Sequence, residues 1–489
     1  MKSPKNSKRG KKKSKSKSKS HKSSGKGLQG GGSAGFGTQT VWRAGVDPIE
    51  EGEELSYDPT AYQMLLSFSF EWPCLSFDIA TDSLGEKREA FPHECYVVAG
   101  TQALDPNSNA VCMARLSNVG QGRHGDRKRK GKGKKKKSSE EHAADDDVEM
   151  EVVSDDDDDS DDSESEEEET PYFRAVEVHH RGGINRIRCL NQKTNPGAKV
   201  VATWGETGHV QIWDLSSHMK TLASEKVGVG TQKNKVKHVH QTPLHMVEHS
   251  TEGYALDWCR TSGSLLTGDC NGQILLTSPD ETYVNWNTDM QSFQGHTGSV
   301  EDLQWSPVEE TVFASCSVDK TIKIWDTRQK SKPGLSYVAH DTDVNVISWN
   351  TLTSCMIGSG GDDGSLRIWD MRYISNGQYV ANFDYCKKAI TSIEWSPFEG
   401  SMVATTSADN QICFWDLSVE RDAAEEIEHL NLGEDQDQNV AIPVDIPPQL
   451  LFVHQGQENI KEMHWHEQIP GAVISTAQNG FNVFKPSNI

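Results

Sequence analysis

A short phrase ending in tryptophan and aspartate recurs four times in this chain of 489 residues. The copies are QIWDL at Gln211–Leu215, KIWDT at Lys323–Thr327, RIWDM at Arg367–Met371 and CFWDL at Cys413–Leu417. The last three lie about 45 residues apart, a spacing typical of units that each form a four-stranded antiparallel blade. One blade cannot bury both of its faces, so successive blades stack radially and close a ring. The phrase therefore predicts an all-β propeller, and it favours a scaffold for partners over an enzyme.

The repeat predicts seven blades. Strands at 74–79, 95–100 and 110–116 supply the first blade. Six further units begin near residues that precede an inner strand, namely His180, His249, His296, His340, Cys386 and His454. We therefore expect a seven-bladed WD-repeat propeller over residues 74–489.

A helix is predicted just before the propeller, within the segment 41–73. Asp58-Pro59 is a plausible N-cap with proline at the first helical position. Apolar residues then recur at helical spacing, at Tyr62, Leu65, Leu66 and Phe70. The helix should end before Trp72-Pro73, because a residue that precedes proline disfavours the α region. We expect this helix to pack on the propeller.

Charge divides the chain into segments. Residues 1–26 carry 12 Lys/Arg and no acid, 123–137 carry 10 Lys/Arg and one acid, and 140–169 carry 19 Asp/Glu and no base. We expect 1–40 to be a disordered basic tail and 119–170 a disordered insertion, because both lack periodic apolar residues. The rest of the chain holds 28 Lys/Arg against 52 Asp/Glu. Such an acidic body disfavours phosphate backbones and favours a basic protein partner.

Acidic residues also gather in two places that interrupt the blades. One is a loop predicted at 418–448, and the other is the tract inside the insertion. The tract contains Asp155, Asp156, Asp157, Asp158, Asp159, Glu166, Glu167, Glu168 and Glu169. It can screen a basic partner through many weak contacts, or it can merely keep the chain soluble.

Several function classes are disfavoured by what the sequence lacks. The ten cysteines include no C-x-x-C pair, so neither a disulfide framework nor a zinc site is indicated. No P-loop, nucleophile elbow or metal-spaced cluster is found, so we expect no catalysis, no cofactor and no metal. No apolar run approaches the roughly 18 residues that a membrane span needs, and the Lys/Ser-rich start lacks the apolar region of a secretory signal.

The repeated polar residues are predicted to be structural. In WD propellers the equivalents of His296, Ser315, Asp319 and Trp325 form a buried hydrogen-bonded chain. The next units repeat part of this set, with His340, Asp363 and Trp369, and then Asp409 and Trp415. Their recurrence once per blade indicates framework and argues against a catalytic or metal site.

Another set of positions should surround the mouth of the channel on the top face of the ring. These positions are Asn185, Glu206, Tyr254, Glu301, Asn345, Asp362 and Thr391. They include three acids and no base, so they form either an acidic binding rim or an ordinary solvated edge.

Two segments resemble the histone-binding WD proteins of the chromatin-assembly class. They are EWPCLSFDI at Glu71–Ile79, which follows the expected helix, and DIPPQLLFVHQG at Asp445–Gly456. In that class a helix and a proline-proline loop pinch a side groove that holds a basic histone helix. By this resemblance the groove would involve Tyr62, Leu65, Leu66, Phe70, Glu71, Asp445, Pro447 and Pro448.

The span from about Val41 to Ile489 resembles one branch of that class, the glutamate-rich WD-repeat proteins. Phrases that carry the resemblance include AGTQA, GGINRIR, HTGSVEDLQWSP and DVNVISW. It implies a nucleolar ribosome-assembly factor that chaperones a newly made basic protein of the large subunit, L-three, and delivers it to early pre-large-subunit particles.

Two other functions stay open. One is histone binding on chromatin. The other is a substrate adaptor of a cullin-type ubiquitin ligase, because Trp325–Arg328 and Trp369–Arg372 match a short WDxR pattern. The basic runs at 1–26 and 127–137 favour a nuclear or nucleolar address or contact with RNA, and solvated charge is the alternative.

Overall fold

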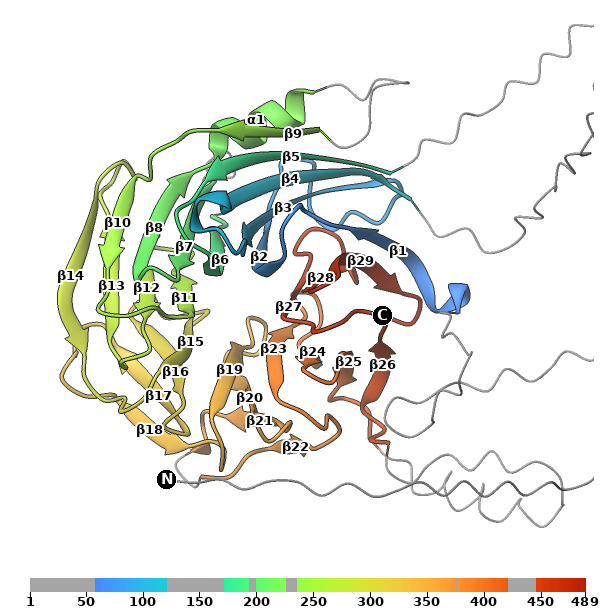
Figure 1. Ribbon diagram of the computed structural model, residues 1–489. Coiled ribbons are helices and arrows are strands. Elements are labelled where there is room, and N and C mark those ends of the chain that lie inside the picture. Colours follow the sequence, from blue (N-terminus) through green and yellow to red (C-terminus); the bar gives the residue numbers. More distant parts are fainter. Residues whose placement is uncertain (1–57, 121–170, 193–198, 226–234, 375–376, 421–445) are drawn as a thin grey trace, which may run out of the picture. The chain divides into compact units, whose positions relative to one another are not determined.

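The structure is a computed structural model that describes residues 58–120, 171–192, 199–225, 235–374, 377–420 and 446–489. These residues belong to one compact unit, 57–489, and form seven sheets arranged as a ring (Figure 1). The predicted all-β, seven-bladed propeller is confirmed. The basic tail at 1–40, nearly all of the insertion at 119–170 and most of the acidic loop at 418–448 fall outside the described residues.

The blades follow one another along the chain, each beginning with its inner strand. The first contains β2 (Cys74–Ala80), β3 (His93–Thr101), β4 (Ala110–Val119), β5 (Tyr172–His179) and β9 (Lys235–Val239). The second contains β6 (Ile184–Leu190), β7 (Val200–Gly205), β8 (His209–Asp214) and β10 (His245–Glu248). The third contains β11 (Ala255–Trp258), β12 (Leu265–Gly268), β13 (Ile274–Pro279) and β14 (Trp286–Phe293).

The remaining four blades repeat this order. The fourth contains β15 (Val300–Trp305), β16 (Val312–Ser317), β17 (Thr321–Asp326) and β18 (Leu335–Val338). The fifth contains β19 (Val344–Trp349), β20 (Met356–Gly361), β21 (Leu366–Asp370) and β22 (Ala381–Phe383). The sixth contains β23 (Ile390–Trp395), β24 (Met402–Ser407), β25 (Gln411–Asp416) and β26 (Leu450–His454). The seventh contains β27 (Glu462–Trp465), β28 (Val473–Ala477), β29 (Gly480–Pro486) and β1 (Tyr62–Phe68).

The predicted N-terminal helix is wrong. Asp58 does cap a 3-10 helix, Pro59–Ala61, through a hydrogen bond from the backbone amide of Thr60, but that helix has only three residues. The chain then continues as β1, which pairs antiparallel with β29 so that Leu65 lies opposite Phe484. Pairing an early strand with the last strand closes the ring and leaves no open edge at the seam. This closure outweighs the helical spacing of the apolar residues.

The hydrophobic core is divided into layers between neighbouring blades. In one layer Phe293 of the third blade packs with Phe313 and Trp325 of the fourth, and all three are fully buried. The seam layer joins Phe77 of the first blade to Phe481 of the seventh. Because burial occurs between blades, the inner strands are left to line a polar central channel.

An insertion after β8 adds two elements outside the first blade. Helix α1 (Ser216–Ser224) buries Leu222 beside Met113 and Val178, and β9 joins β5 as a parallel fifth strand. A second 3-10 helix, Pro106–Ser108, lies between β3 and β4. None of the described helices has the length and apolar character that crossing a membrane requires.

Candidate partner-binding surfaces

The fourth blade contains a hydrogen-bonded chain of four side chains. Nδ1 of His296 lies 2.8 Å from Oδ2 of Asp319, and its Nε2 lies 2.6 Å from Oγ of Ser315. Nε1 of Trp325 donates to the same hydroxyl at 2.8 Å. His296 is nearly inaccessible on its side chain, and burial lowers its pKa. These groups are used up by one another, so they hold the blade together and offer nothing to a ligand.

The fifth blade repeats the chain and the sixth does not complete it. His340 lies 3.1 Å from Asp363 and 2.8 Å from Ser359, to which Trp369 donates at 2.9 Å. In the sixth blade Trp415 donates to Thr405 at 3.1 Å, and Asp409 accepts from the backbone amide of Lys387 at 2.9 Å. Cys386 stands where the histidine would be, and Oδ1 of Asp409 is buried without a hydrogen-bond partner.

The residues expected to line a side groove lie on two different faces of β1. Tyr62 and Leu65 pack in the layer between the sixth and seventh blades, where the Tyr62 hydroxyl lies 2.7 Å from Nδ1 of His454. Leu66 and Phe70 pack in the next layer, toward the first blade. A strand alternates its side chains across a sheet, so these residues cannot form the single wall that a helix would give.

The other members of the expected groove are scattered. Glu71 is exposed, and Pro447 and Pro448 lie half-buried in the turn that leads to β26. Asp445 lies outside the described residues, as does the acidic tract at 155–169.

The predicted rim residues lie at the start of the inner strands or in the turns beside them. Three are linked to neighbours: Asn185 donates to Glu252 at 3.2 Å, Asn345 donates to Asp362 at 2.9 Å, and Thr391 lies 2.7 Å from the hydroxyl of Thr406. Glu206 is exposed, and Tyr254 and Glu301 are half-buried. Burial raises the pKa of Glu301 and of Tyr254.

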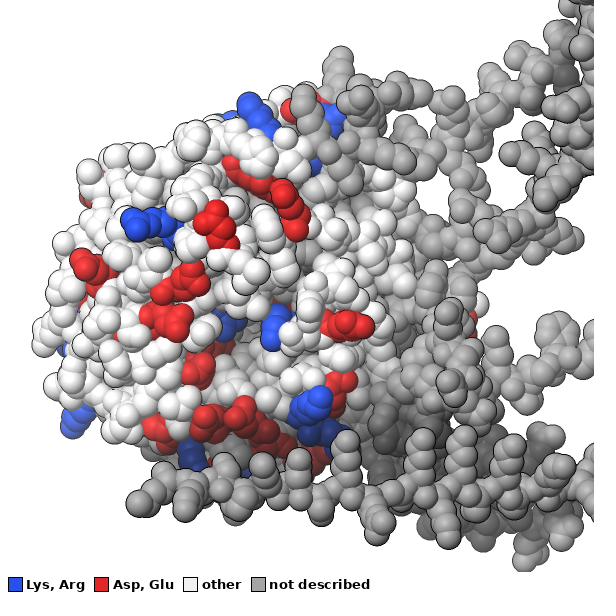
Figure 2. Space-filling model, in the orientation of Figure 1, with Lys and Arg blue, Asp and Glu red and all other residues white. Residues whose placement is uncertain are grey.

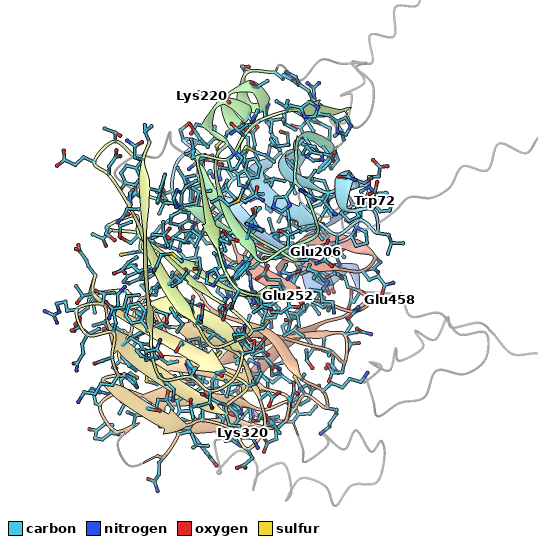
Figure 3. All side chains as sticks on the ribbon, turned by 60° about the vertical axis from the view of Figure 1, so that its left-hand side comes forward. Trp72, Glu206, Lys220, Glu252, Lys320 and Glu458 are labelled. Carbon is cyan, nitrogen blue, oxygen red and sulfur yellow. The ribbon has the colours of Figure 1, made fainter. Side chains whose placement is uncertain are left out.

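Sequence reasoning missed other groups on this face. Glu252 and Glu458 precede the inner strands β11 and β27, and they lie beside Glu206 around the channel opening (Figure 3). Figure 2, which looks onto this face, shows Asp and Glu side chains spread around its centre. Trp72 is 37% exposed nearby, and Gln102 links the two parts, because its amide nitrogen donates to Pro73 and its side chain to Asn185. Only the position of each acid before an inner strand could have revealed it.

Carboxylates inside the channel join neighbouring inner strands. Inner strands diverge and do not pair with each other, so their inward amides need other acceptors. Five carboxylates accept a backbone amide from the following blade: Asp78 from Cys189, Asp257 from Trp305, Asp302 from Ile347, Glu394 from Trp465, and Glu462 from Phe77, at 2.7–3.1 Å. They stiffen the ring from within.

Four ion pairs cross the same channel. Arg186 and Arg188 both contact Glu462, at 2.7 and 2.6 Å, and His464 contacts Glu394 at 2.9 Å. The fourth pair joins Arg260 to Glu467 at 2.5 Å. Although burial opposes its charge, Arg188 and Arg186 hold the pKa of Glu462 well below its usual range. Burial also opposes the charge of His464, but Glu394 and Glu462 raise its pKa to about 10.

Comparison with known proteins gives three relatives that match over most of their length. Protein HEAT STRESS TOLERANT DWD 1 of Arabidopsis thaliana is 50% identical, covering 92% of each chain. Glutamate-rich WD repeat-containing protein 1 of Dictyostelium discoideum is 46% identical over 92% of this chain and 86% of its own. Ribosome assembly protein rrb1 of Schizosaccharomyces pombe is 42% identical over 89% and 82%.

The chain belongs to the glutamate-rich WD-repeat family.

Two broader families match parts of this member. Residues 287–326, 331–370 and 377–416 match the WD domain, G-beta repeat. Residues 52–120 match the family described as the histone-binding protein RBBP4 or a component of the CAF1 complex. The second match covers β1 to β4, so it includes the strand that closes the ring.

The two WDxR segments of this family member end the strands β17 and β21. The guanidinium of Arg328 donates back to Asp326, and that of Arg372 donates back to Asp370. Both arginine side chains are largely exposed, at 74% and 65%. Each arginine is thus paired within its own turn, which is the local, strand-ending role, and an adaptor function stays a prediction.

Proposed function

We propose that this protein is a ribosome-assembly factor of the nucleus and nucleolus. It acts without catalysis, as a chaperone that binds a newly made basic protein of the large ribosomal subunit and delivers it to pre-ribosomal particles. The observation that carries the proposal is the acidic face around the channel opening, with Glu206, Glu252 and Glu458 around it and Trp72 beside it (Figures 2 and 3). The name of the Schizosaccharomyces pombe relative supports ribosome assembly.

The charge of this face suits a client that must later be released. A ribosomal protein outside its RNA carries dense, unpaired Lys and Arg side chains. Exposed ion pairs contribute about 0–1 kcal/mol each and weaken with salt, so many of them hold the client while rRNA can still displace it. The exposed indole of Trp72 adds an apolar anchor of the kind that dominates interface energies.

The family resemblance makes L-three the expected client. The basic runs at 1–26 and 127–137 would direct the protein to the nucleus, and the acidic tract at 140–169 would raise the local concentration of carboxylates around the client.

The proposal is tested by measuring the affinity of the full chain for purified L-three in moderate salt. The triple variant Glu206→Gln, Glu252→Gln and Glu458→Gln should bind at least about tenfold more weakly, with a shallower dependence on salt. The matched control removes three exposed carboxylates from turns at other places in the blades, with Glu281→Gln, Glu309→Gln and Glu399→Gln. Equal binding by wild type and both variants would reject the acidic face as the client site.

A second candidate is histone binding, which the match of residues 52–120 favours. Histones are basic as well, so the same face could accept them. Competition between purified H3–H4 and L-three for the full chain separates the two functions. Displacement of bound L-three only at a large excess of histone supports the ribosomal client, and the reverse supports histones.

A further inference from the structure

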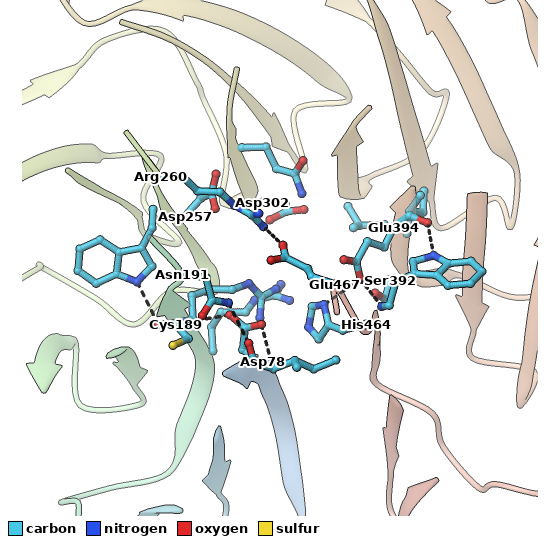
Figure 4. A pocket seen from close by; sticks show the side chains of 18 residues that line it. Asp78, Cys189, Asn191, Asp257, Arg260, Asp302, Ser392, Glu394, His464 and Glu467 are labelled. Atoms are coloured by element: carbon cyan, nitrogen blue, oxygen red, sulfur yellow. Dashed lines mark hydrogen bonds and ion pairs between the residues drawn. The ribbon is translucent and has the colours of Figure 1, made fainter. Parts of the chain in front are cut away.

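The central channel contains a cavity of about 130 Å³ (Figure 4). Its lining residues come from the middle and the end of the inner strands, including Asn191 and Arg260 just beyond β6 and β11. The acidic rim lies at the start of those strands, so the cavity is the part of the channel farther from the rim. The Arg260 side chain is 59% exposed, which shows that solvent reaches the cavity.

Charges in and beside the cavity do not balance. Five lining residues are acids, and Glu462 adds a sixth carboxylate beside them, against Arg186, Arg188, Arg260 and a protonated His464. All four cations are committed to Glu462, Glu467 or Glu394. The acids outside these pairs are Asp78, Asp257 and Asp302.

Asp257 and Asp302 face the cavity from adjacent blades, on β11 and β15 (Figure 4). Within the described part of the chain neither carboxylate has an ion pair, and the acceptor bonds of both come from backbone amides. Burial, with Asp302 as a further cause, raises the pKa of Asp257 to about 7, and burial also raises the pKa of Asp302. Two carboxylates that repel each other in a desolvated site would be stabilised by a cation between them.

The walls of the cavity indicate what kind of cation fits. Apolar surface from Ile79, Val346 and Ile393 lies beside the carboxylates. No group of three or more His, Cys, Asp or Glu side chains suited to a metal ion occurs among the described residues. A site with two free carboxylates and apolar walls suits an organic cation, with a charged head and a methylene stem, better than a metal ion.

We propose that this cavity binds a primary alkylammonium group, held between Asp257 and Asp302, with its methylene stem along the apolar wall. A lysine side chain of a partner protein and a free polyamine both carry this group. The proposal stands apart from the chaperone function, because the binding of a small ammonium ion requires no client.

Calorimetric titration of the full chain tests the site with two probes, spermidine and Nα-acetyl-lysine N-methylamide. The 6-hydroxynorleucine analogue of the second probe, with a hydroxyl in place of the ammonium, is the uncharged control. The double variant Asp257→Asn, Asp302→Asn removes both charges but keeps a carbonyl oxygen for the amides of Trp305 and Ile347. Glu309→Gln is the matched variant, because it removes an exposed carboxylate from the turn after β15.

We expect binding of one ammonium probe per chain, no binding of the uncharged analogue, and an affinity at least about tenfold weaker in the double variant. Glu309→Gln should bind as wild type does. Tighter binding of spermidine assigns the site to a free polyamine, and tighter binding of the lysine derivative assigns it to a partner's lysine. Equal affinities in all three proteins, or no wild-type binding at millimolar probe, would overturn the proposal. Thermal melts check folding, and the two single variants replace the double variant if it does not fold.

Discussion

Glu462 on β27 and Arg188 on β6 form an ion pair of 2.6 Å that spans the channel from the seventh blade to the second. Arg186 contacts the same carboxylate at 2.7 Å. Its other oxygen accepts the backbone amide of Phe77, on the blade between them, at 3.0 Å. One carboxylate that is only 1% exposed therefore connects three blades at the seam of the ring.

Replacing this carboxylate should destabilise the ring strongly. Glu462→Gln leaves two arginines in the channel without their counter-ion, so we expect the free energy of unfolding to fall by about 3–5 kcal/mol. Urea unfolding at pH 7 measures the change. Glu467→Gln is the control, because it breaks an ion pair whose Arg260 side chain is 59% exposed, and it should cost roughly 0–1 kcal/mol. Similar losses in the two variants would contradict the role of Glu462.

The buried His454 should make stability depend on pH. Burial lowers its pKa to about 4, whereas an unfolded histidine titrates near 6.5. Between these values the unfolded chain binds a proton that the folded chain does not, so this contribution is present above pH 6.5 and is lost as the pH falls toward 4. His454→Gln should flatten the slope of unfolding free energy by up to about 1.4 kcal/mol per pH unit. Urea titrations from pH 4.5 to 6.5 measure it, and the exposed His240→Gln should leave the slope unchanged.

Lys199 is a buried cation that should cost stability. It is fully buried, burial lowers its pKa, and its ammonium donates one hydrogen bond, to Thr81 at 3.0 Å. Lys199→Met keeps a long side chain and removes the charge, so we expect the free energy of unfolding at pH 7 to rise by about 1 kcal/mol. Lys199→Ala also removes the charge but opens a cavity, and it should lower stability. A loss in the methionine variant as large as that in the alanine variant would show that the ammonium itself is needed.

Local repetition made the blades predictable. His296, Ser315, Asp319 and Trp325 fall within one unit of about 45 residues, so their spacing alone predicts the hydrogen bonds that they form. The channel offered no such signal. Arg186 and Glu462 are 276 residues apart, and only the closure of the ring brings them to 2.7 Å.

The failure at β1 has the same cause. Tyr62, Leu65, Leu66 and Phe70 satisfy helical spacing, but Tyr62, Met64, Leu66, Phe68 and Phe70 also alternate with a period of two, as a strand requires. The choice between these patterns is made by β29, more than 400 residues later, because β1 has no hydrogen-bonded partner without it. The candidate groove failed with the helix, whereas the rim depended only on positions within each repeat.

The stacking of Phe68 on Phe481 provides a direct test of this closure. Their ring centroids lie 4.8 Å apart with an interplanar angle of 14°, and Phe68 is half-buried at the seam. Phe68→Ala should lower the free energy of unfolding by about 2 kcal/mol, and it should speed amide hydrogen exchange in β29, because a loosened β1 exposes the edge of its partner. Ser67→Ala, on the exposed face of the same strand, should change stability by no more than about 0.5 kcal/mol and leave exchange in β29 as it is in wild type. If exchange in β29 is the same in both variants, β1 does not close the ring, and the helical interpretation of residues 62–70 returns.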